Sequence, residues 1–260
     1  MQGSALVTGA ATRIGKAIAL GLASEGVNVA IHYSSSEAEA KEVASKAMEM
    51  KVKACLVKAD LLKDEEVEGL VSNASNKLNE PLNILVNNAS IFEYDNIKSI
   101  TSESWDRHIG SNLKAPLFLI KSFAQQAEKS LKDENGELLA QANVINIIDQ
   151  RVLKKNPEFF TYSLAKMGLW SVTQTAAQGL APHIRVNAVA PGPTLKGRRQ
   201  SEDHFSNQRK NTILERGSDI SEISEAVKFI INTRSMTGQL ICIDGGQHLV
   251  WKTQDILGVE

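Results

Sequence analysis

Short apolar runs of strand-like composition alternate along this chain with longer amphipathic runs of helical period. Strand–helix alternation predicts βαβ units, and right-handed crossovers turn such units into a doubly wound parallel sheet with helices on both faces. We therefore expect an α/β fold with about seven strands. The strand-like runs are 4–8, 27–33, 52–58, 82–87, 142–148, 184–190 and 239–243, and the helical runs are 14–25, 36–50, 64–79, 102–130, 157–181 and 221–233.

The chain has 260 residues, which allows one α/β domain or two small ones. No Pro-, Gly- or Ser-rich linker divides it, so we expect a single domain over 1–260. The polar stretch 194–219 has no clear period. It is either an ordinary surface excursion or a lid over a site, and we favour the lid because long loops inside compact domains are often functional.

The first strand-like run is followed by a glycine-containing turn, from Gly9 to Gly15, and then by an amphipathic run. Glycine lets the backbone approach a diphosphate, and the N-terminus of the following helix offers unpaired N–H groups and a positive dipole end. This order predicts a dinucleotide site in a Rossmann-type sheet. The alternative is a plain strand-to-helix turn.

Tyr162 and Lys166 are four residues apart in a helical run, and Asp149 precedes Tyr162 by thirteen residues. Side chains at this spacing share one helix face. A nearby ammonium lowers the pKa of a phenol from about 10, which makes the phenol a usable proton donor near neutral pH. An isolated pair of this kind is usually a solvated helix face, but the glycine turn upstream favours a catalytic pair.

At this point the chain resembles the short-chain dehydrogenase/reductase family over nearly its whole length. Within the family it is most similar to the pteridine and dihydromonapterin reductases, because of Arg13, the segment 88–92 and Asp149, where most members have serine. The motifs that carry the resemblance are Thr8-Gly9-x-x-x-Arg13-Ile14-Gly15, Asp60-Leu61, Asn87-Asn88-Ala89, Asn112, Tyr162-x-x-x-Lys166, Pro191-Gly192 and Asp244-Gly245-Gly246.

The end of the second strand-like run suggests which nicotinamide cofactor is used. An NAD enzyme usually has an acid there to bind the ribose hydroxyl, and this chain has three serines instead. We therefore predict NADPH, although Ser-Ser-Ser-Glu is also an ordinary helix N-cap. Arg13 is predicted to reach a phosphate, and the resemblance to the pteridine reductases implies that it also faces the substrate; otherwise it is an exposed first-turn arginine. The predicted cofactor contacts in this part are Gly9, Arg13, Ile14, Gly15, His32, Tyr33, Ser34, Ser35 and Ser36.

Further cofactor contacts follow from the resemblance, although each is also compatible with a simple turn at the end of a strand. Asp60 and Leu61 match the pair beside the adenine. Residues Asn88, Ala89 and Ser90 match the segment along the ribose, while Pro191, Gly192 and Thr194 match the loop at the nicotinamide. No metal site is predicted.

The resemblance also implies catalytic roles. Tyr162 is the proton donor, Lys166 lowers its pKa and holds the nicotinamide ribose, and Asn112 supports a proton-relay water, unless it is only a polar helix residue. Asp149 is the discriminating residue, because an ionised carboxylate only accepts hydrogen bonds and repels a developing alkoxide. A heterocycle with N–H donors is then a better substrate than a ketone. The alternative is that Asp149 caps the following turn and that catalysis is lost.

These features predict NADPH-dependent reduction of a C=N bond in a dihydropterin, of the dihydromonapterin or dihydrobiopterin type, with protonation through Tyr162 and Asp149. The resemblance implies that Phe92 stacks on the pterin, although a phenylalanine after a strand is more often core. One alternative is a carbonyl or 3-oxoacyl-thioester reductase, and another is a catalytically silent NADPH-binding protein. The predicted substrate contacts are Arg13, Ser90, Phe92, Asp149 and Tyr162.

Charge and hydropathy limit the other partners. The net charge is −1, so no global field attracts nucleic acid or membrane. No apolar run reaches about 18 residues, no leader precedes the first strand, and Cys55 and Cys242 lie in apolar runs as expected for reduced thiols. These observations predict a soluble, cytoplasmic protein. Members of the resembled family form dimers or tetramers through the helices near 102–130 and 157–181, so a homo-oligomer is expected.

Overall fold

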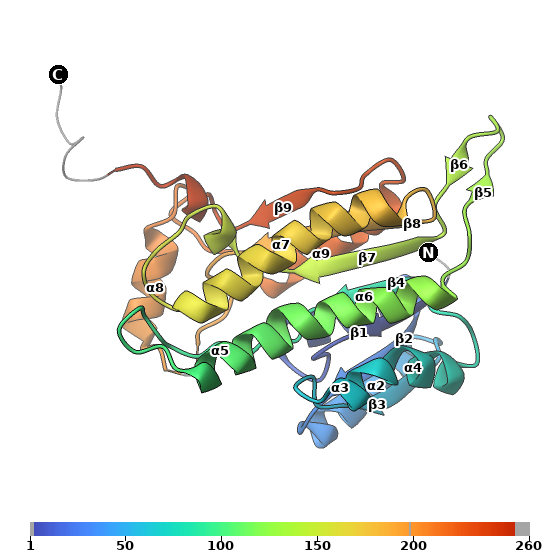
Figure 1. Cartoon of the computed structure of the whole chain (residues 1–260), viewed down its shortest axis with the longest axis horizontal. Helices are drawn as coiled ribbons and strands as arrows, with labels where there is room; N and C mark the ends of the chain where they lie inside the picture. Colours follow the sequence, from blue (N-terminus) through green and yellow to red (C-terminus); the bar gives the residue numbers. More distant parts are fainter. Residues whose placement is uncertain (1–2, 198, 253–260) are drawn as a thin grey trace.

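The computed structural model describes residues 3–197 and 199–252, and a single parallel sheet of seven strands forms its centre (Figure 1). The strand order is β3-β2-β1-β4-β7-β8-β9, so the chain winds outward in both directions from β1 and β4. This arrangement confirms the predicted Rossmann-type α/β fold in one domain. The strands are β1 (Ser4–Val7), β2 (Asn28–Tyr33), β3 (Ala54–Lys58), β4 (Ile84–Asn87), β7 (Ala142–Ile147), β8 (Ile184–Pro191) and β9 (Leu240–Ile243).

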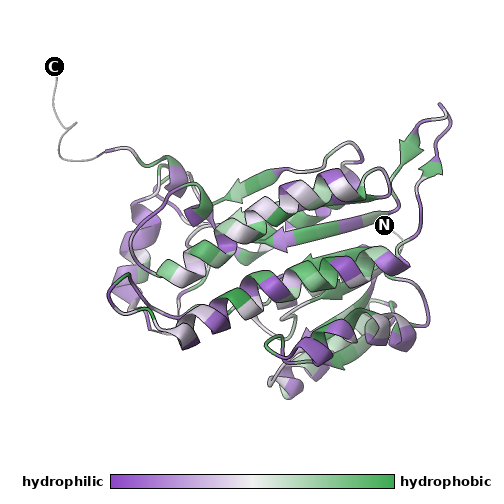
Figure 2. Cartoon of the chain, in the orientation of Figure 1, coloured by the Kyte–Doolittle hydropathy of each residue, from purple (hydrophilic) through white to green (hydrophobic). Residues whose placement is uncertain are grey.

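Helices cover both faces of this sheet, and Figure 2 shows mostly hydrophobic strands beside helices of mixed hydropathy. One or two helices lie between consecutive strands of this sheet and return the chain to the same edge, which the alternation in the sequence predicts. The helices are α1 (Arg13–Ser24), α2 (Glu37–Glu49), α3 (Asp64–Glu68), α4 (Leu70–Leu78), α5 (Ser102–Ile109), α6 (Ala115–Gln126), α7 (Phe160–Leu180), α8 (Glu202–Lys210) and α9 (Ile220–Asn232).

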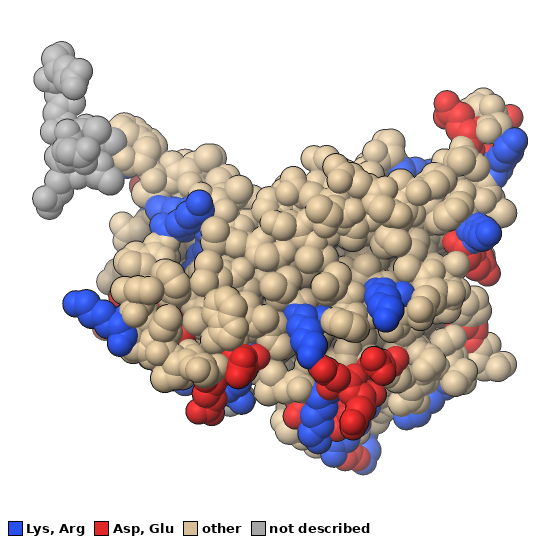
Figure 3. Space-filling model, viewed as in Figure 1, with Lys and Arg blue, Asp and Glu red and all other residues tan. Residues whose placement is uncertain are grey.

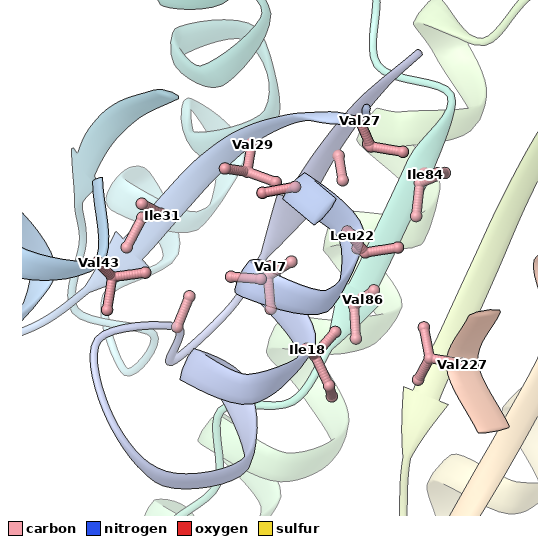
Figure 4. Packing of buried hydrophobic residues seen from close by; sticks show 14 of the residues in the cluster. Val7, Ile18, Leu22, Val27, Val29, Ile31, Val43, Ile84, Val86 and Val227 are labelled. Atoms are coloured by element: carbon pink, nitrogen blue, oxygen red, sulfur yellow. The ribbon is translucent and has the colours of Figure 1, made fainter. Parts of the chain in front are cut away.

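One face of the sheet packs against α1, α2 and α9. Strand side chains of one parity, such as Val7 and Val29, meet Ile18 of α1 and Val43 of α2 there, and all four are fully buried (Figure 4). Because both faces of a parallel sheet are covered, the strands are continuous apolar runs and not alternating ones. Ala10 and Ala11 belong to this cluster, so it fixes the position of the turn from Gly9 to Gly15 relative to the sheet.

The opposite face packs against α4, α6 and α7. Leu6 and Leu85 point to this side and contact a second apolar cluster that includes Phe123 of α6 and Leu78 of α4. These side chains are almost completely buried. Two clusters on opposite sides of one sheet give a three-layer domain, so the loops at the strand ends stand on a rigid base.

The structure differs from the sequence prediction at several helices. The run 64–79 is split at Gly69 into α3 and α4, and the run 102–130 contains a π-helical turn at Gly110–Lys114 between α5 and α6. The short antiparallel strands β5 (Leu131–Lys132) and β6 (Leu138–Leu139) form a projecting hairpin that was not predicted (Figure 1). Strands of two residues leave no periodic signal, so pattern analysis does not find them.

The stretch 194–219 contains α8 and is tied down at both ends. The guanidinium of Arg209 donates to the carbonyl oxygens of Pro193, Gly217 and Ser218 at 2.8–3.2 Å. Arg198 of this stretch lies outside the described residues. Whether the stretch moves as a lid stays a prediction.

The two thiols are free and half-buried, and burial raises the pKa of Cys55 and of Cys242 to about 11. Both therefore stay protonated at neutral pH. Within 3–197 and 199–252, no helix combines the length and the apolar character that a membrane crossing requires.

Candidate active site

The predicted site residues gather along one edge of the sheet, where the parallel strands end. Gly9 follows β1, Asn88 follows β4, Asp149 follows β7 and Gly192 follows β8. Ligands bind at this edge in open α/β sheets, next to the point where the strand order reverses, which here lies between β1 and β4. The topology therefore brings together motifs that lie far apart in the sequence.

The glycine turn is packed so closely that a side chain does not fit at Gly15. Gly9 has a φ of +62°, a conformation that glycine adopts without strain. A Cβ on Gly15 would lie 2.2 Å from the carbonyl oxygen of Gly9 and 2.5 Å from Nδ2 of Asn88. The same amide of Asn88 donates to the Thr8 carbonyl at 2.9 Å, which joins the turns after β1 and β4. Both glycines are therefore required by the backbone itself.

His32 does not offer its ring to a ligand, although the sequence predicts it among the cofactor contacts. The N–H of Gly9 donates to its Nδ1 at 2.9 Å, so the ring proton is on Nε2, which lies 3.1 Å from the Ala59 carbonyl. Burial lowers the pKa of His32 to about 4, so the ring is neutral. His32 thus supports the glycine turn from below by linking the ends of three neighbouring strands.

Arg13 and the serines after β2 were both predicted to contact the cofactor, and both lie at the carboxyl edge of the sheet. Arg13 begins α1 with a φ of +54°, and its guanidinium donates to the carbonyls of Leu195 and Lys196 at 3.2–3.4 Å. It therefore contacts the start of the 194–219 stretch from within the glycine turn.

Ser34 and Ser35 are exposed after β2, and Ser36 is the N-cap of α2 without a capping hydrogen bond from its side chain. The serine hydroxyls are thus not occupied by a helix cap.

Asp149 makes two interactions at once, one structural and one with the predicted proton donor. Its Oδ1 accepts from the N–H of Arg151 at 2.8 Å and caps a short 3₁₀ turn, Gln150–Val152. Its Oδ2 accepts from the hydroxyl of Tyr162 at 2.9 Å. Capping and contact with Tyr162, which the sequence analysis treats as alternatives, are both present.

The prediction that Lys166 lowers the pKa of Tyr162 is wrong for this arrangement. Burial, and then the charge and hydrogen bond of Asp149, raise the pKa of Tyr162 well above its usual value, because a phenolate beside a carboxylate is unfavourable. The ammonium of Lys166 donates instead to the Ile147 carbonyl at 2.9 Å, and burial lowers the pKa of Lys166 to about 8. Tyr162 is therefore protonated at neutral pH, and in this arrangement it is a weaker acid than a free tyrosine.

Asn112 lies in the π-helical turn and is completely buried. Its amide donates to the Ile91 carbonyl at 2.8 Å and accepts from the Ile91 N–H at 2.9 Å. This pair of bonds holds the segment that carries Ser90 and Phe92 against the helix. The side chain of Asn112 therefore acts on that loop, and its predicted relay role stays a prediction.

An aromatic group stands over the Tyr162 ring. Phe92 is stacked on Phe159, with ring centroids 4.3 Å apart, and meets the Tyr162 ring edge to face at 4.7 Å. The guanidinium of Arg151 lies 4.7 Å from the centroid of Phe159 and 5.4 Å from that of Phe92. Phe92 is about half exposed, so it is not a core residue, and its contact with a substrate stays a prediction.

A buried polar chain fixes the start of α7. The Thr161 hydroxyl donates to Asp95, and the Nδ1 of His108 lies 2.7 Å from the same hydroxyl oxygen. Because the Nε2 of His108 accepts from the Glu93 N–H at 3.1 Å, the ring proton is on Nδ1 and points to Thr161. Burial lowers the pKa of His108, so this tautomer is neutral. The residue next to Tyr162 is thereby anchored to the 93–95 loop.

Comparison with known proteins agrees with this geometry. A family model described as enoyl-(acyl carrier protein) reductase matches residues 9–248. A short-chain type dehydrogenase/reductase from Picea abies is 30% identical over 94% of this chain and 91% of its own length. The chain belongs to the short-chain dehydrogenase/reductase family.

Other relatives within the short-chain dehydrogenase/reductase family differ in their substrates. A crystal structure of FolM alternative dihydrofolate reductase 1 from Brucella suis, in complex with NADP, is 44% identical with a TM-score of 0.90, over 98% of both chains. The 3-oxoacyl-[acyl-carrier-protein] reductase FabG of Staphylococcus epidermidis is 31% identical over 96% of this chain and 100% of its own. The angucycline C-6 ketoreductase LanV, crystallised with NADP, is 28% identical with a TM-score of 0.85, over 96% and 98% of the two chains.

The remaining predicted cofactor contacts of this family member lie at the same edge. Asp60 and Leu61 begin the turn after β3, where the Asp60 carboxylate accepts from the Leu62 N–H at 3.0 Å. The Thr194 hydroxyl is buried and lies 2.6 Å from that of Ser218. These contacts shape the loops, and direct contact with a cofactor stays a prediction for them as for Ile14, Tyr33, Ala89, Ser90, Pro191 and Gly192.

Sequence reasoning missed five residues of this site: Arg151, Phe159, His108, Thr161 and Asp95. They lie in loops or at helix ends, where periodicity carries no information. Arg151 had the one usable signal, because it follows the discriminating Asp149 by two residues.

Proposed function

We propose that this protein reduces the C=N bond of a dihydropterin, of the dihydromonapterin or dihydrobiopterin type, with NADPH. The observation that carries the proposal is the hydrogen bond from the Tyr162 hydroxyl to Asp149 at 2.9 Å. It puts a carboxylate, which only accepts hydrogen bonds, beside the proton donor, where a substrate rich in N–H groups binds best. The 44% identity to FolM from Brucella suis supports the same substrate class.

The residues at the carboxyl edge fit an NADP-type cofactor. The closely packed glycine turn leads into α1, whose first turn has no acidic residue to repel a diphosphate. Ser34 and Ser35 are exposed after β2, and the exposed Lys58 is the register partner of Tyr33 on β3. Hydroxyls and a cation at this position suit a ribose 2′-phosphate, and similar structures were crystallised with NADP.

Residues of the chain supply the proton that the reduction requires. A nicotinamide cofactor held at this edge would supply the hydride for the carbon of the C=N bond, and the nitrogen must then gain one proton for the reduction to balance. Tyr162, which is protonated at neutral pH, supplies that proton, and a replacement proton reaches it from solvent through Asp149, whose Oδ2 accepts from the Tyr162 hydroxyl. The Lys166 ammonium, buried next to the pair, offsets the negative charge that Tyr162 leaves behind.

A second candidate is reduction of a ketone or a 3-oxoacyl thioester. The 31% identity to FabG of Staphylococcus epidermidis and the likeness to the ketoreductase LanV favour it. Asp149 opposes it, because a carboxylate repels the alkoxide that forms when a carbonyl is reduced. A catalytically silent NADPH-binding protein is the third candidate, and the intact Tyr162–Lys166 pair opposes that.

Variants at Asp149 separate these candidates. The wild-type protein is expected to oxidise NADPH with a 7,8-dihydropterin, at a higher kcat/KM than with NADH, and not with acetoacetyl thioester or an activated ketone. Asp149→Asn is expected to lose pterin reduction by at least about a hundredfold, with an unchanged Kd for NADPH. Asp149→Ser is expected to lose pterin reduction as well, and to gain weak ketone reduction. Wild-type pterin turnover in Asp149→Asn would contradict the proposal.

We also propose that the protein forms a homo-oligomer, a dimer or tetramer, through α5, α6 and α7. The charged residue within α7 is Lys166, which is buried, and Figure 3 shows few charged side chains over this helix. Trp105, Leu117 and Leu164 expose between a third and a half of their surface on the same helices. Light scattering on the purified protein tests this, and a monomer at micromolar concentration would contradict it.

A further inference from the structure

We propose that Arg151 binds an oxygen acceptor of the substrate, and that together with Asp149 it selects a ring edge that carries an N–H donor beside a C=O acceptor. The substrate class rests on the proposed function. The contact itself rests on the position and surroundings of the Arg151 guanidinium.

The guanidinium of Arg151 has a neighbour on each of two sides. On one side its Nε lies 4.0 Å from Oδ1 of Asp149, the oxygen that also accepts from the backbone N–H of Arg151 at 2.8 Å. On the other side the planar head group lies over the rings of Phe159 and Phe92. Stacking on aromatic faces orients a guanidinium without using its hydrogen-bond donors.

One of those donors is buried and has nothing to bond. Among the described residues the Nη1 of Arg151 has no hydrogen-bond partner, although the side chain is only 14% exposed. A buried hydrogen-bond donor without a partner is unfavourable, and native proteins keep few of them. A donor held in this way beside the reactive pair points to an acceptor that arrives with the substrate.

The position of Arg151 limits which acceptor it can bind. The carboxylate of Asp149 lies between Arg151 and Tyr162. Its Oδ1 is 4.0 Å from Nε of Arg151, and its Oδ2 is 2.9 Å from the Tyr162 hydroxyl. The acceptor is therefore on the ring being reduced or on a group attached directly to it. A carboxylate that accepts and a guanidinium that donates, side by side, complement a lactam edge, which a simple ketone does not have.

A purely structural role for Arg151 makes different predictions. If the guanidinium only kept Asp149 ionised and oriented, its loss would lower kcat and move the pH profile. If it binds substrate, its loss raises KM for the substrate and leaves both the pH profile and the affinity for NADPH unchanged. Arg151→Lys keeps the positive charge near Asp149 but removes the planar head group, so it isolates the contact.

The experiment compares wild type, Arg151→Lys and Lys155→Met, where Lys155 is an exposed cation on the same loop that serves as control. KM and kcat are measured at saturating NADPH with 6-methyl-7,8-dihydropterin, a hydroxyalkyl dihydropterin and dihydrofolate. Binding of the corresponding oxidised pterins to the NADP⁺ complex is followed by fluorescence quenching. We expect Arg151→Lys to raise KM and pterin Kd by at least about tenfold, the scale of a hydrogen bond to a charged group.

The three substrates identify the acceptor. A loss shared by all three assigns the contact to the ring carbonyl. A loss confined to one substrate assigns it to that substrate's hydroxyl or carboxyl tail, which still supports an oxygen acceptor but overturns the lactam edge. A KM and Kd within twofold of wild type, with a lowered kcat and a moved pH profile, would overturn the binding role.

Failure of the proposed function is distinguishable from failure of this inference. If the wild-type protein neither binds nor reduces any pterin, the dihydropterin assignment and the lactam edge are both wrong. The same Arg151→Lys comparison is then made with the ketone or thioester that the wild type reduces. An unchanged KM there would overturn the contact too.

Discussion

The two halves of the site at the carboxyl edge are built on opposite principles. Around the glycine turn, polar groups are paired within the protein: both ring nitrogens of His32 and the amide of Asn88 bond to backbone groups. Around Asp149, three buried side-chain atoms have no partner among the described residues, namely Gln150 Oε1, Arg151 Nη1 and Ser163 Oγ. The first half has one such atom, Asn87 Oδ1 at the end of β4, so most of the groups that a ligand can complete lie in the second half.

Charge divides the halves in the same way. Burial leaves His32 neutral under the glycine turn, whereas Lys166, Asp149 and Arg151 bring three charged groups close to Tyr162. In the cofactor half, backbone packing forms the site without a buried charge. In the substrate half, the pKa values of Tyr162 and Lys166 are shifted from their ordinary values, as is common at catalytic sites. Substitutions in the two halves are therefore expected to fail differently.

The largest effect is expected in the substrate half, from Tyr162→Phe. Removing the hydroxyl removes the proton donor, so kcat should fall by at least about a hundredfold, while the Kd for NADPH should stay within about twofold. Steady-state kinetics and a fluorescence titration with NADPH measure the two. If turnover survives, Asp149 or water delivers the proton, and the role assigned to Tyr162 in the substrate half would be wrong.

In the cofactor half, acid is expected to destabilise the fold through His32. In the unfolded chain His32 is protonated below about pH 6.5, whereas in the folded protein it is protonated only below about pH 4. The free energy of unfolding therefore falls as the pH falls through this window. At about 1.4 kcal/mol per pH unit, the loss approaches about 3 kcal/mol at pH 4. Urea unfolding between pH 7 and pH 4.5 measures it.

The control for this acid effect is His32→Gln, which does not titrate. Its unfolding free energy should vary less with pH than that of the wild type. His108 is also buried with a lowered pKa and adds to the slope in both proteins. Equal slopes for wild type and variant would mean that His32 does not carry the effect.

A smaller effect is expected from Gly15→Ala, also in the cofactor half. The new Cβ would lie 2.2 Å from the Gly9 carbonyl, so the turn must shift, at about 1–3 kcal/mol of stability and with weaker NADPH binding. Gly179→Ala in α7 is the matched control, because a Cβ there meets nothing within 4 Å. It should stabilise the protein by about 0.5–1 kcal/mol. Thermal unfolding with and without NADPH distinguishes the pair, and equal behaviour would contradict the close packing of the turn.

Much of the fold followed from local pattern. The alternation of apolar and amphipathic runs predicted the seven parallel strands, because the period of a strand or helix is a property of the chain itself. Split helices, the π-helical turn at Gly110–Lys114 and the β5–β6 hairpin were not predicted. These features are short or depend on neighbours, so they leave no period of their own.

By itself the sequence determined the parallel sheet, the glycine turn and the Tyr162–Lys166 spacing, because each is a local property that backbone geometry dictates. Only the tertiary structure decided the direction of the Tyr162 pKa, the neutral role of His32 and the placement of Arg151 over Phe92. The bond between Asp95 and Thr161 joins residues 66 positions apart. Burial and charge pairing depend on such long-range distances, which a pattern along the chain does not contain.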